Sequence, residues 1–245
     1  MTTILAVNGD GSGTIDHSLI VSKAALTQLR NFGALGAGRG QSIDLTSEEQ
    51  ARAMAPLLGP GVSYVASEPI DTPLGQGRHT RYAFADVTQV RISEQPRSDG
   101  LPIRPPEIAA HNGDITCALT HEPTGNAVLH INLPELNIPS ALGDTTGNPA
   151  LTQQLALIRT LLAGARISIG VEPAGQLVRT SSPFVEGPRV TLLEVDLDQV
   201  LGNQAVLARL QSAKTSDDVR AALTDVPGLK MTLDREVTIE FTAAK

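Results

Sequence analysis

The chain has 245 residues and a formal net charge of −7, with 41% hydrophobic residues, 2% aromatic residues and a single cysteine. A chain of this length can bury a full core, and its ordinary hydrophobic content excludes the collagen, coiled-coil and disordered classes. The acidic balance and the lack of any run of basic residues argue against a nucleic-acid partner. No stretch approaches the roughly 20 apolar residues of a membrane span, so we expect a globular protein without a transmembrane segment.

The first part of the chain predicts paired strands with helices between them. Ser22 is a suitable N-cap for one helix, and Thr46 with Glu49 forms a capping box ahead of another. The expected elements are a hairpin or two linked strands over 3–21 around the NGDGSG segment, helices over 23–35 and from about 47 to 58, and strands at 62–70 and 80–92.

The middle of the chain holds the strongest hairpin. It follows a segment at 95–113 whose four prolines and two glycines preclude regular structure. Glu122–Gly125 suits a type I turn, and pairing Glu122 with Asn126 separates apolar from polar positions. This register places on one face Cys117, Leu119, Ala127, Leu129 and Ile131.

A second irregular segment at 134–148 precedes the C-terminal elements. They are a helix over 149–163, strands at 165–172, 176–180 and 189–197, helices at 199–212 and 216–224, and a last strand at 236–242. Strands that come in hairpins with helices between them favour the α+β class over strict βαβ alternation. We therefore expect a single α+β domain over 1–245, an antiparallel sheet built from hairpins with about four to five helices packed on it.

The loop from Asn8 to Asp16 imitates a calcium-binding loop. Asn8, Asp10 and Ser12 fall at the first, third and fifth positions of an EF-hand, but the twelfth is then Leu19 rather than Glu. The other register begins at Ala6 and also lacks an essential carboxylate. We therefore predict a turn between strands, and a chain that folds without a metal.

The five histidines show no spacing of a helical metal site, and the hairpin register places His121 and His130 on opposite faces. No Gly-x-Ser-x-Gly elbow exists, and Cys117 falls on an apolar strand face, where a thiol is usually inert. No catalytic residue and no cofactor is predicted from these residues.

Three carboxylates form the one candidate for metal or acid–base chemistry. Glu194, Asp196 and Asp198 alternate with Val195 and Leu197, which in a strand places all three on one face. Such a face can gather a hard cation or raise one carboxyl pKa by mutual repulsion. The simpler interpretation is a solvated face, with Asp198 capping the helix that follows.

Three segments resemble a group of uncharacterised bacterial exported proteins that often carry a lipid anchor. They are VNGDGSGTIDHSLIVSKAAL near the start, ISIGVEPAGQLVRTSSPFVEGPRVTLLEVDLDQVL from Ile167, and DVPGLKMTLDREVTIEF near the end. The strand, Pro-Ala-Gly turn, Thr-Ser-Ser loop and second strand of the central segment are also similar to LppM-type envelope lipoproteins. The resemblance implies an exported cell-envelope protein and supplies no catalytic residue.

We therefore expect a non-catalytic, exported cell-envelope protein with a binding or structural role, whose partner is a protein or an apolar ligand. The alternatives are a metal-dependent hydrolase built on Glu194, Asp196 and Asp198, and a carrier of an apolar ligand. The start MTTILAVNGDG has no signal-peptide pattern. A lipid anchor is accordingly expected only in a longer precursor, and a cytoplasmic location stays open.

Overall fold

The computed structural model describes residues 1–23, 25–27, 47–73, 75–93, 113–134, 164–213 and 215–242. The helix predicted at 149–163 lies outside these residues. So do both predicted irregular segments, apart from their end residues 113 and 134, and most of the helix predicted at 23–35.

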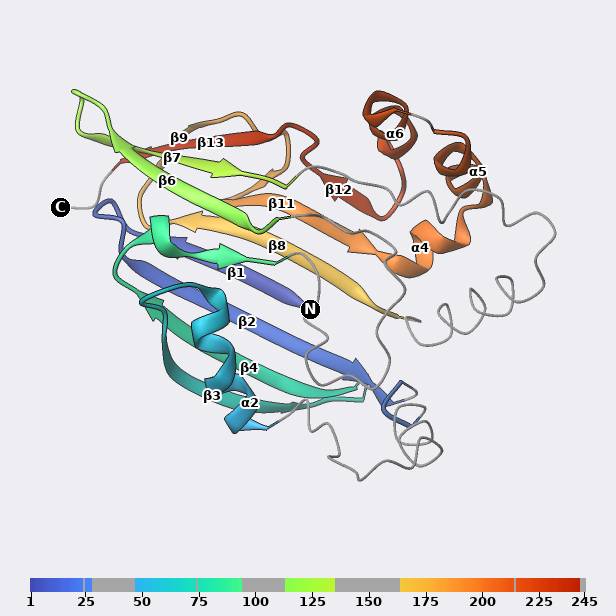
Figure 1. The fold of residues 1–245 in the computed structure, drawn as a ribbon, viewed down its shortest axis with the longest axis horizontal. Helices are drawn as coiled ribbons and strands as arrows, with labels where there is room; N and C mark the ends of the chain where they lie inside the picture. The colour runs from blue at the N-terminus through green and yellow to red at the C-terminus, as the bar shows by residue number, and fades with distance from the viewer. Residues whose placement is uncertain are drawn as a thin grey trace.

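Two β-sheets pack face to face across a common core (Figure 1). Sheet A has eight strands in the order β10-β11-β8-β1-β2-β4-β3, with β12 also paired to β11, and sheet B has five in the order β5-β6-β7-β13-β9. Sheet A consists of β1 (Thr2–Val7), β2 (Gly13–Ser22), β3 (Ser63–Asp71), β4 (Gly75–Phe84), β8 (Arg166–Pro173), β10 (Val185–Glu186), β11 (Arg189–Asp196) and β12 (Leu229–Met231). Sheet B consists of β5 (Arg91–Ile92), β6 (Ile115–His121), β7 (Asn126–Asn132), β9 (Leu177–Thr180) and β13 (Glu236–Thr242).

Alternating side chains decide which face of each sheet is buried. Along β1, Leu5 and Val7 face the core while Ile4 and Ala6 lie on the other, partly exposed face. In β13, Val237, Ile239 and Phe241 are buried in the same way. The inner faces of both sheets contribute to one continuous apolar core, as the period-two pattern of the sequence predicts.

The α+β class is confirmed, but the sheets are more extensive than hairpins alone would give. Strand β1 pairs with β2 in the predicted antiparallel hairpin and with β8 in parallel. Strands β8 and β9, which follow each other at the Pro-Ala-Gly turn, do not pair, because β8 belongs to sheet A and β9 to sheet B. The prediction of one antiparallel sheet is therefore wrong at this point.

A close backbone approach explains the crossing between the sheets. After β8, Ala174 donates its N–H to the Val7 carbonyl, and Gln176 then exchanges hydrogen bonds with Thr242 at the end of β13. A Cβ atom at Gly175 would collide with the Thr242 carbonyl oxygen. Only glycine lets the chain pass this close, so the turn leads into sheet B and not back along β8.

The predicted register of the central hairpin is confirmed. Glu122 donates its N–H to the Asn126 carbonyl, and Gly125 has a φ of +89°, as the predicted turn requires. Cys117, Leu129 and Ile131 lie in the core. Because a one-residue slip would turn these side chains to solvent, the apolar pattern was sufficient to fix the pairing.

The helices differ from prediction mainly at their ends. They are α2 (Glu48–Met54), the 3₁₀ segments η1 (Ala55–Leu58) and η2 (Val87–Gln89), α4 (Leu197–Gly202), α5 (Gln204–Ser212) and α6 (Ser216–Leu223). The N-cap of α2 is Ser47, whose hydroxyl accepts the Gln50 N–H. The helix predicted at 199–212 starts earlier and is divided at Asn203, whose side chain caps α5.

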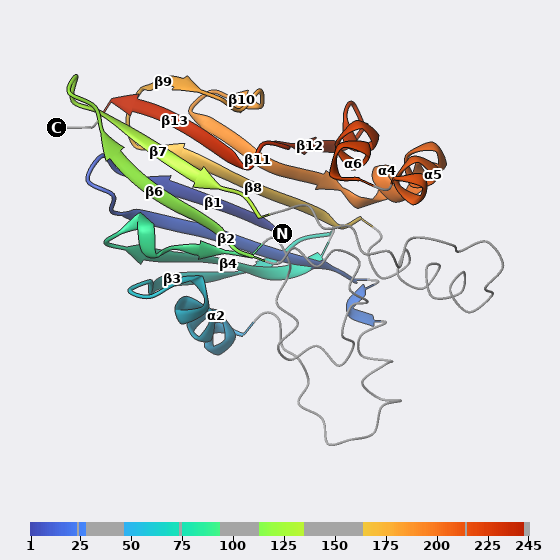
Figure 2. The same ribbon diagram turned by 45° about the horizontal axis from the view of Figure 1, so that its top comes forward.

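Helices cover the two ends of the molecule (Figure 2). Helix α2 packs beside β3, and the buried Tyr82 hydroxyl donates to the Ala51 carbonyl at 2.9 Å. Helices α4, α5 and α6 lie together at the other end, next to β11 and β12 (Figures 1 and 2). The strand predicted at 80–92 is interrupted, because β4 ends at Phe84 and η2 precedes β5.

We expect a chain cut between residues 96 and 112 to leave the two fragments associated. Sheet A takes β1–β4 from the N-terminal part and β8, β11 and β12 from the C-terminal part, so each fragment lacks half of a shared core. A protease site inserted there, followed by size-exclusion chromatography, tests this. Two separately folded fragments after cutting would contradict the single-domain prediction.

Replacement of Gly77 by alanine should destabilise the protein by about 1–3 kcal/mol. A Cβ atom at this position of β4 would collide with the Leu19 carbonyl oxygen of β2, so the two strands must separate. The control is Gly202→Ala, since nothing lies within 4 Å of a Cβ at Gly202. Urea unfolding should give a lower midpoint for Gly77→Ala alone, and equal midpoints would contradict the packing argument.

Candidate functional site

The three predicted carboxylates do not share a face, because helix α4 begins at Leu197. Glu194 and Asp196 lie at the end of β11, whereas Asp198 lies in the first turn of α4. The interpretation of all three as alternating strand residues is therefore wrong for Asp198. The prediction that Asp198 caps the helix is also wrong, since the N-cap is Asp196, whose carboxylate accepts the Gln199 N–H.

Each of these carboxylates has a different partner. Glu194 pairs with Lys230 at 3.1 Å, and Asp196 accepts from the Arg166 guanidinium at 2.7 Å. That hydrogen bond and those from Gln199 lower the pKa of the Asp196 carboxyl. Asp198 accepts the Gly164 N–H at 2.9 Å. The structure thus does not bring the three together, and across the described ranges no group of three His, Cys, Asp or Glu residues could hold a metal ion.

The loop after β1 forms a closed turn. The Asp10 carboxylate accepts hydrogen bonds from the N–H and the hydroxyl of Ser12, and these hydrogen bonds lower the pKa of Asp10. Asn8 in turn donates to the Ser12 hydroxyl at 2.9 Å. The side chains that imitate a calcium loop therefore bond to one another and link β1 to β2, as the turn prediction requires.

The other reactive side chains of the sequence have structural surroundings. Cys117 is buried in the core, and burial raises the pKa of its thiol to about 12. His121 contacts the Gly9 carbonyl at 2.7 Å, and His130 contacts Glu236 at 2.6 Å on the outer face of sheet B. These two histidines lie on opposite faces, as the hairpin register predicts.

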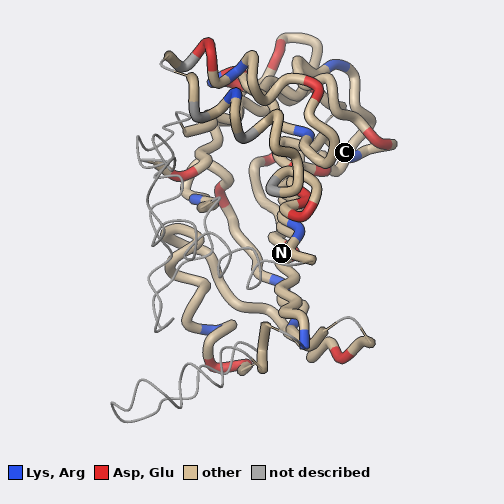
Figure 3. The backbone as a smooth tube through the Cα atoms, turned by 90° about the vertical axis from the view of Figure 1, so that its right-hand side faces the viewer, with Lys and Arg blue, Asp and Glu red and all other residues tan. Residues whose placement is uncertain are grey.

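The outer face of sheet A carries ion pairs between neighbouring strands. Arg81 binds Asp16 at 2.8 Å, and Arg189 binds Glu172 at 2.7 Å. Acidic and basic positions are interspersed over the described chain (Figure 3). Exposed pairs of this kind contribute little stability, and this face has the character of a solvated surface.

On the inner face of sheet A, residues that lie opposite one another across the strands form rows, here called levels, and one apolar level is followed by a polar one. Leu5, Ile15, Tyr82 and Tyr64 lie opposite one another across β1, β2, β4 and β3. At the next inner position, two residues further along β1, β2 and β4 and three residues further along β3 because of a bulge after Tyr64, the side chains are all polar. We call these four residues the polar row: Thr3, His17, Thr80 and Ser67.

The polar row is unusual because part of it is buried. Thr3 is 2% exposed and Thr80 is 3% exposed, whereas His17 and Ser67 are partly exposed. The Thr3 hydroxyl lies 3.0 Å from His17 Nδ1, and Thr80 hydrogen-bonds the Tyr82 phenol. Buried polar groups are unfavourable unless they are hydrogen-bonded. The polar row therefore places hydrogen-bonded polar side chains at buried positions of the sheet.

Burial lowers the pKa of His17 to about 4, with smaller contributions from the nearby N-terminus and from His79. At neutral pH the imidazole is therefore uncharged, with one nitrogen that donates a hydrogen bond and one that accepts. A neutral imidazole can both donate and accept a hydrogen bond, as the hydroxyl groups beside it can.

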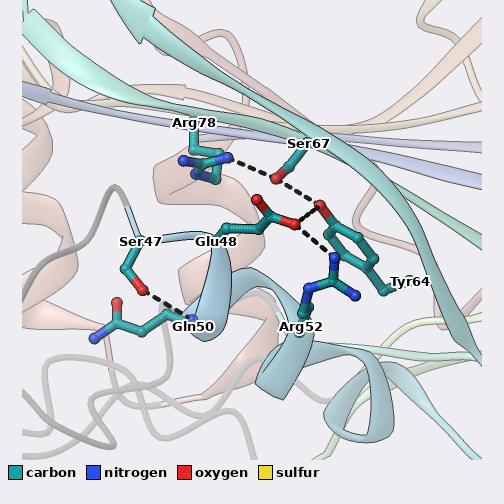
Figure 4. Close-up of polar contacts among 7 residues, drawn as sticks. All are labelled: Ser47, Glu48, Gln50, Arg52, Tyr64, Ser67 and Arg78. Carbon is teal, nitrogen blue, oxygen red and sulfur yellow. Dashed lines mark hydrogen bonds and ion pairs between the residues drawn. The ribbon is translucent and has the colours of Figure 1, made fainter.

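A second set of polar contacts joins the polar row to α2 (Figure 4). Arg78 of β4 donates to the Ser67 hydroxyl at 2.6 Å, and Ser67 lies 2.8 Å from the Tyr64 hydroxyl. The Tyr64 hydroxyl donates to Glu48 at 3.0 Å, and Arg52 donates to the same carboxylate oxygen at 2.6 Å. We call these residues the α2 network.

The contacts of the α2 network orient its side chains and keep the Glu48 carboxyl ionised. The Arg52 guanidinium lies 4.3 Å from the centre of the Tyr64 ring, a cation–π distance. Hydrogen bonds from Arg52 and Tyr64 lower the pKa of Glu48, so its carboxyl stays ionised. The network contains two guanidinium groups, those of Arg52 and Arg78, and one carboxylate, that of Glu48, so its three charged members sum to a net charge of +1 at neutral pH.

Sequence reasoning did not find the polar row. Its members come from four strands, and each of them alternates normally with its neighbours. A histidine or threonine at an inner position of one strand is common. Only the registers of β1, β2, β4 and β3 reveal that four such positions lie side by side.

No family model matches the sequence, and no curated protein matches it. Among solved structures, the chain is similar to the folded domain of the LppM protein of Mycobacterium tuberculosis, determined by NMR. The TM-score is 0.32 and the identity 11%, over 100% of this chain and 89% of that chain. This is a weak likeness and does not define a shared fold. In the described part of the chain, no helix combines the length and apolar character needed to cross a membrane.

Asp196→Ala should lower the melting temperature by roughly 2–4 °C, because it removes the N-cap of α4 and the partner of Arg166. Glu194→Gln, two residues earlier in β11, should change the melting temperature by about 1 °C or less, since only a surface pair with Lys230 is lost. Thermal unfolding measured by circular dichroism compares the two. Equal effects would show that the cap contributes nothing.

The stability of the protein should depend on His17 between pH 6.5 and 4. The unfolded chain takes up the His17 proton near pH 6.5 and the folded protein only near pH 4, so wild-type stability falls as the pH is lowered through this window. In His17→Gln this loss should be absent. Melting temperatures of both proteins across the window test this, and parallel curves would contradict the pKa shift.

Proposed function

We propose that this chain is a non-catalytic binding protein of the bacterial cell envelope, and that its ligand contacts the polar row. The observation that supports the binding site is the burial of two polar side chains, Thr3 and Thr80, next to the apolar residues Leu5 and Tyr82 on the inner face of sheet A. Hydrogen-bonding groups kept at such positions are typical of sites that trade stability for recognition.

A binding role is better supported than a catalytic one. The only thiol is buried with a raised pKa, and the neutral His17 bonds to Thr3, which is itself 2% exposed. The alternative of a metal-dependent hydrolase needs Glu194, Asp196 and Asp198 to converge. Each of these has a separate partner instead, so the geometry does not favour that alternative.

The character of the ligand follows from what surrounds the polar row. Beyond it along β2, Leu19 and Val21 continue the inner face and stay partly exposed. Hydroxyl and imidazole groups next to apolar surface suit a ligand with both a polar and an apolar part. The apolar-ligand alternative is therefore kept for ligands that also carry a polar group.

The cell-envelope location is proposed from the resemblance of the three sequence segments to exported lipoproteins. Fractionation of the native bacterium, with an antibody against this chain, tests it. We expect the protein in the envelope or periplasmic fraction. Recovery in the cytosol alone would contradict the location and leave the binding site open to test.

Amide NMR spectra recorded with a panel of water-soluble sugars, amino acids, carboxylic acids and phosphates test the binding site. A compound that binds should shift the amide signals of Thr3, His17, Thr80 and Ser67 in the wild type. Thr80→Val removes one hydroxyl from the row and should weaken the response. Thr14→Val, on the outer face of β2, should not change it.

Two results would contradict the proposed function. One is a panel whose responses all fall outside the polar row. The other is chemical turnover of a bound compound. Calorimetric titration with calcium, magnesium and zinc tests the alternative of a metal-dependent hydrolase. Metal binding that is lost in Asp196→Asn would favour that alternative over the proposed binding function.

A further inference from the structure

We propose that β-bulges at Val65 and Val178 block the open edges of the two sheets, so that neither edge pairs with a strand of a second copy or of a partner protein. An open edge presents unpaired backbone N–H and C=O groups, on which a strand of another chain can form a ladder. If these edges are blocked, a protein partner binds through side chains and not by adding a strand. The blocked edges do not involve the polar row.

Two strands form the longest open edges. Among the described residues, β3 pairs only with β4 at one end of sheet A, and β9 pairs only with β13 at one end of sheet B (Figure 1). At the opposite ends, β10 and β5 have two residues each, and β12, which pairs with β11, has three. Strands of about five or six residues are usual, so these short strands offer little for another chain to pair with. The edges that need protection are therefore β3, with nine residues, and β9, with four.

Strand β3 has one residue more than the part of β4 with which it pairs. Tyr64 lies opposite Tyr82. Ala66 lies opposite Arg81, the adjacent residue of β4, so Val65 has no residue opposite it. A bulge of this kind bends the strand and increases its twist. The N–H and C=O groups on the two sides of Val65 therefore do not form one straight row for a further strand.

Strand β9 has a bulge of the same kind. Arg179 lies opposite Glu240, and Leu177 lies opposite Phe241, the adjacent residue of β13. Val178 is therefore the extra residue, and it interrupts the ladder after two pairs. The Arg179 side chain is 80% exposed and pairs with Glu240 at 3.1 Å. Charged side chains on an edge strand also oppose pairing with another chain.

A proline and a carboxylate restrict the rest of β3. Pro69 has no N–H to donate to a ladder, and proline within a sheet is confined to edge strands, strand starts and bulges. Only residues 66–68 lie between the bulge and Pro69, and the last of them is the exposed Glu68. A second chain would therefore meet no regular run of more than three residues along β3.

The exposure of the two valines indicates that these bulges do not serve packing. Val65 and Val178 are each 51% exposed, the largest values among the exposed large apolar side chains of the described residues. A bulge in the internal strand β11 differs, because its extra residue Leu192 is 2% exposed and lies in the core. The extra residue thus adds to the core in an internal strand, whereas at the two edges its main effect is on the backbone.

Deletion of Val65 and deletion of Val178, alone and together in the full chain, test the proposal. Because neither valine has a residue opposite it, each deletion leaves the other strand pairs in register and makes the edge regular. The mass of each variant is measured by light scattering after size-exclusion chromatography over a range of protein concentrations. We expect the wild type to keep the mass of one chain, and the deletion variants to rise toward the mass of two or more chains as the concentration increases.

Val65→Ser and Val178→Ser are matched controls, since they remove the apolar side chain and keep the extra residue. Both should keep the mass of the wild type. Association of the deletion variants alone shows that the backbone of the bulge, and not the valine side chain, blocks the edge. Deletion variants that have the circular dichroism spectrum of the wild type and associate no more than the serine variants overturn the inference.

Hydrogen exchange of the wild type covers the case in which a deletion variant does not fold. The amides of residues 66–68 and 178–180 should exchange at the same rates at low and high protein concentration. The rates should also stay the same with a synthetic peptide of the β3 sequence, residues 63–71. Protection of these amides under either condition shows that the edges accept a strand and overturns the inference. The proposed binding function does not depend on that outcome.

Discussion

The pairing of β1 between β2 and β8 holds the structure together. Through it the antiparallel hairpin of the first 22 residues joins a strand that lies more than 140 residues later in the chain, and this second pairing is parallel. Sheet A is continuous only because of this contact. Its inner face can then cover sheet B, and Leu5, Ile15, Ile169 and Leu129 meet in one core.

The same pairing sets the level at which the polar row lies. Thr3 is opposite His17 of β2 on one side and opposite the apolar Ile169 of β8 on the other, so the row does not continue into β8. The two levels of sheet A therefore have different roles: one stabilises the sandwich by apolar burial, and the next presents hydroxyl and imidazole groups. Since the two levels are only two residues apart along β1, β2 and β4, small shifts in register would mix these roles.

The α2 network shows how a marginal helix is held in place. Helix α2 has only seven residues, too few to be stable alone, and it is held by the Tyr82 bond to Ala51 and by the Tyr64 bond to Glu48. The two tyrosines of the chain lie 6.3 Å apart in an edge-to-face arrangement and both bond α2. The helix in turn fixes Glu48 and Arg52 near the polar row, so local packing and the electrostatics of the candidate site depend on each other.

The sequence by itself determined the local elements. Period-two alternation and turn residues were sufficient for β1 and β2, for the β6–β7 register and for β13, because the side chains that decide them are close in the chain. The exported location and the binding role rest on resemblance and stay predictions. Sequence reasoning placed Asp198 in a strand and made it a cap, because a helix start can be misjudged by two residues when two aspartates compete for it.

Only the tertiary structure decided which strands are neighbours. The parallel β1–β8 pair and the passage of Gly175 into sheet B depend on contacts between residues more than 60 positions apart. No local pattern encodes such contacts, since each strand presents the same alternation whichever partner it takes. The polar row exists for the same reason. Thr3, His17, Ser67 and Thr80 are ordinary residues in four separate strands, and only the packing that buries Leu5 and Tyr82 brings them into one line.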